Sequence, residues 1–178
     1  MDLAQLYIIH YPDPRLRRRT EEVAALHEQV RPLAARMLEL MHEQRGVGLA
    51  APQVGRPERL FVANVTGQPD GDCVYVNPVL SELRGSMESV EGCLSIPGVE
   101  VTVRRAAAVV LEAVDLEGRA VRVEAEGLAA RVFQHELDHL DGRLIIDRMN
   151  ETDRIATRRS LRQLEQEFKK KRSAAARR

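Results

Sequence analysis

Hydrophobic positions along this chain recur with two periods, one typical of helices and one typical of strands. A helical period predicts a first helix over residues 31–44. Its apolar stripe consists of Leu33, Met37, Leu40 and Met41, with Gln44 extending it. Pro32 suits the first turn of this helix, and Gly46 is predicted to end it as a left-handed cap.

The middle of the chain is rich in β-branched residues and predicts strands. The strand-like segments are residues 59–65, 73–80, 99–103, 107–115 and 120–126. The sequence DLEG at 115–118 is a hairpin signal between the last two. A second helix is predicted near 128–140, where Gly142 stops it. Helices on both sides of consecutive strands predict an α+β fold with mostly antiparallel sheet.

The C-terminal segment combines a helical pattern with positive charge. Residues 154–178 carry ten lysines and arginines against two glutamates, Glu165 and Glu167. The apolar residues at helical spacing are Ile155, Leu161, Leu164 and Phe168. We interpret the segment as an amphipathic, solvated helix that ends in a flexible tail, with a nucleic-acid contact as the alternative.

Length and composition indicate how many domains the chain forms and in which cellular compartment we expect it. The chain has 178 residues, 44% of them hydrophobic and 30% charged, and its net charge is zero, which is typical of a single globular domain. The N-terminus has no export signal, and no stretch approaches about 18 consecutive apolar residues. We therefore expect a cytoplasmic protein without a membrane contact, whose cysteines stay reduced. Cys73 is predicted to lie in the core, and Cys93 by itself would be interpreted in the same way.

The predicted second helix carries the motif His-Glu-x-x-His as His135, Glu136 and His139. Its polar side chains share one arc, which we interpret as the solvent face: Arg131, Gln134, Asp138 and Asp141. The two histidines and Glu136 lie on the apolar arc instead. Burying an unpaired carboxylate beside two imidazoles costs several kcal/mol. A divalent cation held by the histidines would compensate this cost, with the glutamate in reach of a water on the metal.

Two histidines do not complete a catalytic metal site, which normally takes three protein ligands. A third histidine in the pattern HExxHxxGxxH is excluded, because position 145 is Ile145. One alternative is a downstream glutamate, Glu165, although it lies in the basic segment. The other is Cys93, which precedes the Pro-Gly turn at 97–98 and whose thiolate is compatible with iron, zinc, nickel or cobalt.

Three segments in this order closely resemble the signature motifs of the peptide deformylase family. They are GVGLAAPQVG at 46–55, EGCLSIPG at 91–98 and QHELDHLDG at 134–142, and HYPDPRLR at 10–17 is also similar to the family's N-terminal region. The resemblance implies antiparallel sheets packed around a central helix with the HExxH motif, followed by a C-terminal helix. We expect a catalytic domain over residues 1–150 and a basic helix with a flexible tail over 151–178.

The resemblance implies a metal-dependent hydrolase that removes the formyl group from the N-terminal formylmethionine of new bacterial polypeptides and releases formate. Carried over position by position, Cys93, His135 and His139 would bind one divalent metal. The family leads us to expect Fe²⁺, with Ni²⁺, Co²⁺ or Zn²⁺ able to substitute. Water on the metal would attack the formyl carbon, with Glu136 as general base and acid.

The remaining roles follow from the same resemblance. The side-chain amide of Gln53 and the backbone N–H of Leu94 would stabilise the oxyanion, and the backbone at Gly48 would pair with the peptide. An apolar pocket for the methionine side chain would be lined by Val47, Leu128 and Val132, with plain core packing as the alternative interpretation of each. Arg131 is given no catalytic role.

The partner implied is a nascent formylmethionyl polypeptide, acted on by a monomer, and the basic C-terminal segment predicts a contact with the ribosome. Two other hypotheses stay open. One is an HExxH zinc peptidase with Glu165 as third ligand. The other is a non-catalytic nucleic-acid-binding or ribosome-binding module led by the basic segment.

Overall fold

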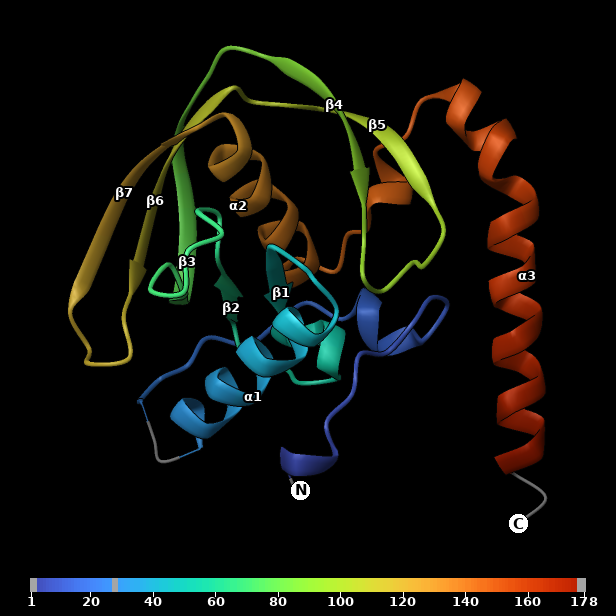
Figure 1. The fold of residues 1–178 in the computed structure, drawn as a ribbon, viewed down its shortest axis with the longest axis horizontal. Coiled ribbons are helices and arrows are strands. Elements are labelled where there is room, and N and C mark those ends of the chain that lie inside the picture. The colour runs from blue at the N-terminus through green and yellow to red at the C-terminus, as the bar shows by residue number, and fades with distance from the viewer. Residues whose placement is uncertain (1–2, 27–28, 176–178) are drawn as a thin grey trace.

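The computed structural model describes residues 3–26 and 29–175 and has an α+β architecture (Figure 1). The strands in this part of the chain are β1 (Gly48–Ala50), β2 (Leu60–Ala63), β3 (Cys73–Arg84), β4 (Met87–Gly92), β5 (Glu100–Arg105), β6 (Ala108–Val114) and β7 (Ala120–Glu126). The α-helices are α1 (Val30–Glu43), α2 (Gly127–Leu140) and α3 (Glu151–Ala175). Short 3-10 helices lie at Leu3–Gln5, Pro14–Arg17, Ala51–Val54 and Ile145–Asp147.

The strands form two antiparallel sheets. Five of them make one sheet in the order β1-β2-β3-β6-β7, and β4 pairs with β5 in the other. The β6–β7 hairpin turns at residues 115–119, where Gly118 has a φ of 80° and so takes a left-handed conformation that glycine adopts without steric cost. The predicted α+β class, the antiparallel pairing and this hairpin are confirmed.

Helix α1 covers the β1–β2 end of the large sheet through the predicted stripe. Its buried side chains include Leu33, Met37, Leu40 and Met41, whereas Gln44 follows the helix and is exposed. The prediction of a left-handed cap at Gly46 is wrong, because Arg45 takes that conformation with a φ of 55°. A Cβ atom on Gly46 would lie 2.8 Å from a terminal methyl carbon of Leu94, so a larger residue there would require the Leu94 side chain to shift.

Helix α2 contacts both sheets. Its apolar side packs on the large sheet, where Phe133 meets the rings of Phe61 and Tyr75. Its other side is joined to β4 and β5 through the ion pairs described below. The helix ends as predicted, with Gly142 at a φ of 74°.

The polar arc of α2 is not the solvent face that the pattern predicted. Asp138 is only 7% exposed, and Gln134 and Asp141 are half-buried. Gln134 hydrogen-bonds the backbone of Ala106, and Asp141 pairs with Arg59 at 3.0 Å. The apolar period of a helix indicates which face packs against a hydrophobic core. It does not show whether the polar face is exposed or is covered by polar residues from other segments.

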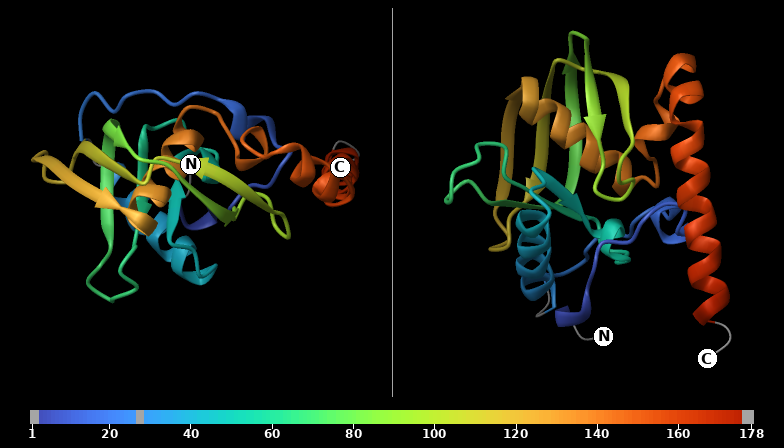
Figure 2. Two further views of the ribbon diagram at one scale, coloured as in Figure 1. Left: turned by 90° about the horizontal axis from the view of Figure 1, so that it is seen from above. Right: turned by 45° about the vertical axis from the view of Figure 1, so that its right-hand side comes forward.

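Helix α3 stands at the edge of the molecule opposite β7, as the views of Figure 2 show. Leu161 and Leu164 pack against a small core that also contains Ile9, Leu16 and Val101. The predicted C-terminal helix is confirmed, and it stays helical to Ala175. The predicted tail end, residues 176–178, lies outside the described residues.

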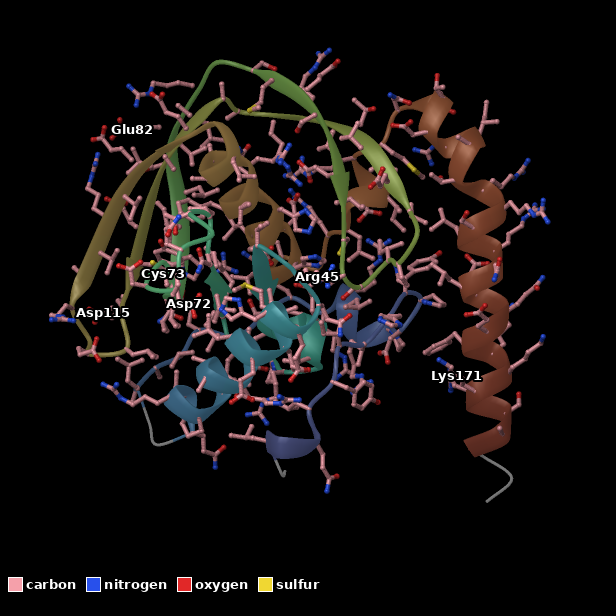
Figure 3. All side chains as sticks on the ribbon, in the orientation of Figure 1. Arg45, Asp72, Cys73, Glu82, Asp115 and Lys171 are labelled. Carbon is pink, nitrogen blue, oxygen red and sulfur yellow. The ribbon has the colours of Figure 1, made fainter. Side chains whose placement is uncertain are left out.

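Cys73 does not belong to the core, so that prediction is wrong. It is the first residue of β3 and is exposed (Figure 3). Both Cys73 and Cys93 are free thiols. Among the helices within residues 3–26 and 29–175, none is long and apolar enough to span a bilayer.

Candidate metal centre

Cys93, His135 and His139 converge on one point. Their potential ligand atoms all lie within 4.8 Å of one another. The two histidines are one turn apart on α2, with ring centroids 5.0 Å apart, and Cys93 directly follows the last residue of β4. The Cys93 sulfur is 3.3 Å from His139 Nε2. The spacing of four residues on α2 places the two histidines side by side. Cys93 joins them because the end of β4 lies next to α2 in the fold.

The donor set fits a divalent metal of the iron, cobalt, nickel and zinc group. One sulfur and two imidazole nitrogens are donors that these metals accept, and three protein ligands leave a position open for reaction. Burial lowers the pKa of His139 well below its ordinary value, which keeps this ring neutral as a ligand requires. Burial would also lower the pKa of His135, but hydrogen bonds with Cys93 and Glu91 raise it to about 10, so a metal would have to displace a proton from that ring. Beside the ligands, the buried Oε2 of Glu136 has no hydrogen-bond partner among the described residues, a costly state unless something else occupies the site.

Glu136 faces the same cleft as the ligands from the preceding position on α2. The side chain is 4% exposed, and burial raises its pKa to about 7, because removal from water disfavours the charged carboxylate. It lies against the backbone of β1, where a Cβ atom on Gly48 would overlap the carboxylate. Gly48 therefore permits the approach of the strand to the glutamate.

His135 is held from behind by Glu91, a residue that the sequence did not single out. The Glu91 carboxylate lies 3.0 Å from His135 Nδ1, which leaves Nε2 directed to the ligand group. Burial alone would raise the pKa of Glu91, but hydrogen bonds from Arg105 and His135 outweigh that effect and lower it to about 2. Glu91 therefore stays ionised and orients the imidazole.

Arg105 continues this chain of charges away from the cleft. Its guanidinium donates to both oxygens of Glu91, at 2.5 and 2.8 Å, and to Asp138 at 2.9 Å. Arg148 binds the other side of Asp138 with two hydrogen bonds. The network Glu91, Arg105, Asp138 and Arg148 therefore ties β4, β5 and α2 to the segment that leads into α3.

Gln53 reaches the site from the 3-10 helix after β1. Its side-chain oxygen, Oε1, accepts a hydrogen bond from the Ala50 backbone N–H at 2.8 Å, which fixes the direction of the side-chain amide. The Nε2 group is 3.7 Å from the Cys93 sulfur and 3.2 Å from the Ser95 hydroxyl. The amide N–H groups therefore point toward the ligands.

A cleft of ≈ 530 Å³ opens in front of these groups. Apart from His139, which lies behind it, the site residues predicted from the sequence all line this cleft: Val47, Gly48, Gln53, Cys93, Leu94, Leu128, Val132, His135 and Glu136. Val47 and Leu128 are 45% and 42% exposed, so they are not plain core residues. Sequence reasoning missed Val90, which is also exposed at the cleft, and Arg131, which was given no catalytic role, lines the cleft as well.

Glu165, the alternative third ligand, lies elsewhere. It is on α3 and accepts a hydrogen bond from the Tyr11 hydroxyl at 2.8 Å. Among the described residues, the one group of three potential ligands contains Cys93 in its place.

Comparison with known sequences gives a consistent result. The family model for polypeptide deformylase matches residues 5–155. A peptide deformylase of Nitrosococcus oceani is 43% identical over 145 residues, which cover 82% of this chain and 87% of the relative. A peptide deformylase of Dictyoglomus thermophilum is 48% identical over 136 residues, covering 76% of this chain and 87% of the relative.

Solved structures agree. The peptide deformylase of Plasmodium falciparum superposes with a TM-score of 0.87 at 36% identity, covering 92% of this chain and 97% of that one. The peptide deformylase of Thermotoga maritima gives a TM-score of 0.77 at 41% identity, covering 82% of this chain and 97% of that one. The family match over residues 5–155 spans all three sequence motifs noted above.

Proposed function

Because this chain belongs to the polypeptide deformylase family, we propose that it removes the formyl group from the N-terminal formylmethionine of new polypeptides and releases formate. The observation that carries the proposal is the grouping of Cys93, His135 and His139 beside the buried Glu136, at the base of a cleft with apolar walls. Hydrolysis of an amide needs an activated water and a proton carrier, and these residues can provide for both.

Cys93, His135 and His139 would hold the metal, which we propose to be Fe²⁺, with Ni²⁺, Co²⁺ or Zn²⁺ as substitutes. When bound, such an ion supplies Lewis acidity, which lowers the pKa of water and polarises a carbonyl. Glu91 supports this role from outside the ligand set, because its hydrogen bond fixes the ring orientation of His135.

Glu136 is proposed as the proton carrier. Its pKa of about 7 lies close to neutral pH, where a group can both accept and donate a proton. The carboxylate takes a proton from the attacking water. It then gives that proton to the amine that leaves when the bond between formyl carbon and nitrogen breaks.

Gln53 and the backbone N–H of Leu94 are proposed to stabilise the oxyanion of the tetrahedral state. The anchored amide of Gln53 supports this role, because its direction is fixed before substrate binds. One such donor typically contributes about 2.7–4 kcal/mol to lowering the barrier.

The peptide itself is proposed to lie along β1. This strand is at the edge of the large sheet, since β2 is its one partner in the described sheet. The backbone at Gly48 can therefore pair with an added strand, a common mode of peptide recognition. The apolar side chains of Val47, Leu128 and Val132 at the cleft would receive the methionine side chain.

The cellular setting of the reaction is part of the same proposal. We place the protein in the bacterial cytoplasm as a monomer that processes chains during synthesis, with α2 as the central element of a catalytic domain over residues 1–150. The basic helix α3 would form a ribosome contact. The cationic side chains along α3, from Arg154 to Arg172, support that contact.

Formate release from a formyl-Met peptide tests the proposed activity, and the appearance of a free amino terminus on the matched acetyl-Met peptide is the control for the acyl group. The Glu136→Gln variant keeps the three ligands and the shape of the side chain but loses the proton carrier. We expect it to bind metal as the wild type does and to lose about 100-fold or more in kcat. The proposal fails if the metal-loaded wild type releases no formate, or if the variant retains full turnover.

A further inference from the structure

One groove of the described chain lies outside the metal centre. It has a volume of ≈ 630 Å³ and lies between the N-terminal segment at residues 7–15 and the C-terminal half of α3. Figure 1 and the right-hand view of Figure 2 show these two elements side by side. We call this feature the α3 groove.

Helix α3 is fixed to the protein near its start and at its middle. The Asp153 carboxylate accepts a hydrogen bond from the Thr102 N–H at 2.6 Å, and Glu165 accepts one from Tyr11. The half of the helix that lines the groove presents Leu164, Phe168 and Lys171, which are spaced to share one helix face. The far wall of the groove is therefore an apolar stripe with a cation at its end.

The charged side chains that line the α3 groove carry a small excess of positive charge, with Arg15, Lys171 and Arg172 against Asp13 and Glu167. Asp13 is bound by the Arg15 guanidinium through both carboxylate oxygens, whereas Glu167 accepts a hydrogen bond from the neutral amide of Gln163. Lys171 forms no ion pair in the described part of the chain, and Figure 3 shows it on the side of α3 toward the N-terminal segment. A ligand with apolar and acidic side chains would complement this wall.

The α3 groove and the catalytic cleft share a wall. His10 lines both of them. Its two neighbours are fixed to the catalytic segments by backbone hydrogen bonds, from the Ile9 N–H to the Gln53 carbonyl and from the Tyr11 N–H to the Ser95 carbonyl, each 2.8 Å long. The groove and the cleft are therefore adjacent at His10.

We infer that the α3 groove is an extension of the substrate site, which holds the downstream part of an unfolded polypeptide whose formylated end lies in the catalytic cleft. The inference rests on the proposed function, because it names the substrate that continues from that cleft. The apolar stripe of Leu164 and Phe168 receives aliphatic and aromatic side chains. Lys171 attracts acidic ones.

RNA is a less suitable occupant of this groove. A polyanion binds where cations are dense, and another surface of α3, lined by Arg158, Arg159 and Arg162, has no acidic residue in its lining. The groove lining mixes its cations with the carboxylates of Asp13 and Glu167. The groove instead combines an apolar wall with a position next to the cleft, with which it shares His10. These two features favour a polypeptide.

The test compares kcat/KM for two substrates with the same formyl-Met-Ala-Ser start. One ends there, and the other continues to about 20 residues, an extended reach of up to roughly 70 Å, with acidic and apolar residues in its second half. We expect the wild type to prefer the long substrate. Lys171→Glu should lower the ratio of long to short by about threefold, and Phe168→Ala should lower it by about tenfold.

Lys170→Glu is the matched control, because it makes the same charge change at the adjacent residue, which does not line the groove. It should leave the ratio unchanged. The inference is overturned if the wild type shows no preference, if Lys171→Glu keeps the full ratio, or if Lys170→Glu lowers it equally. It is also overturned if Lys171→Glu weakens binding of an RNA oligonucleotide but not the preference for the long peptide. Failure of the proposed function differs from all of these, because even the short peptide would then release no formate.

Discussion

Gly48 illustrates how a single residue shapes the site by lacking a side chain. The glutamate carboxylate of α2 occupies the space in which a Cβ atom of residue 48 would lie. The Glu136 carboxylate lies between the backbone of β1 and the group formed by Cys93, His135 and His139. Its position therefore depends on β1 coming closer than any side chain would allow.

We expect Gly48→Ala to displace Glu136 and to reduce kcat/KM by about 100-fold, the size of loss that follows from shifting a catalytic group by about 1 Å. Metal content should stay at the wild-type level, because the three atoms nearest to a Cβ atom at residue 48 all belong to Glu136 and none to Cys93, His135 or His139. Formate release and elemental analysis on the same preparation measure both quantities. Wild-type turnover in the alanine variant would contradict this role of the glycine.

Among single residues, those whose chemistry is local could be predicted from the sequence. Histidines four residues apart on an apolar helix face need a metal or an equivalent, and that need pointed to Cys93. Glu91 could not be identified in this way, because its role depends on Arg105 arriving from a different strand. Cys73 was misassigned because an alternating strand pattern does not indicate which residue begins the strand at the surface.

At the scale of elements, the β4–β5 hairpin is the scaffold that holds the ligand side of the cleft. Arg105 on β5 is 4% exposed and lies between two carboxylates, one on β4 and one on α2. Removing one partner of a buried ion network leaves uncompensated charge, which is more costly than losing an exposed pair. The network therefore couples folding of the hairpin to the orientation of His135.

Arg105→Met is expected to lower the free energy of unfolding by about 3–5 kcal/mol, and to weaken metal binding by about 10–100-fold, as loss of an outer partner does. Arg104→Met is the control, because the neighbouring arginine pairs with Glu88 at the surface with 74% of its side chain exposed. That change should stay within about 0.5 kcal/mol. Denaturant unfolding and a Co²⁺ titration measure the two effects, and equal behaviour of the variants would refute the network's role.

The elements that the sequence predicted are those with a clear period and a buried face. α1, α2 and β7 are within a residue of their expected limits. β4 was missed because its sequence, MESVEG, is mainly polar and its residues alternate between exposed and half-buried, with Glu91 as its buried position. β3 continues to Arg84, four residues past its predicted end, through a segment with irregular pairing to β6.

At the scale of the whole molecule, α3 separates two kinds of surface. One face packs on the body and borders the α3 groove, and the other presents Arg158, Arg159 and Arg162 to solvent. The net charge of the whole chain is zero. The positive charge is therefore concentrated locally on α3 and is not spread over the whole protein. A polyanion such as ribosomal RNA would be attracted to it in a salt-dependent way.

We expect Arg159→Glu to reduce co-sedimentation with ribosomes at low salt, while formate release from a free short peptide is unaffected. Arg84→Glu serves as control, since it places the same charge change on an exposed residue of the large sheet. Association should also weaken as salt increases. Unchanged co-sedimentation of Arg159→Glu would remove α3 as the docking element.

The central claim is that Cys93, which directly follows β4, completes a catalytic metal site with the two histidines of α2. The most direct test is metal content coupled to formate release, with anaerobic purification to protect ferrous iron and the thiolate from oxidation. Wild type and Cys73→Ser, which alters the other cysteine, should both retain metal and release formate. Cys93→Ala should lose both. If Cys93→Ala keeps its metal and its activity, the thiol is not a ligand and the account is wrong.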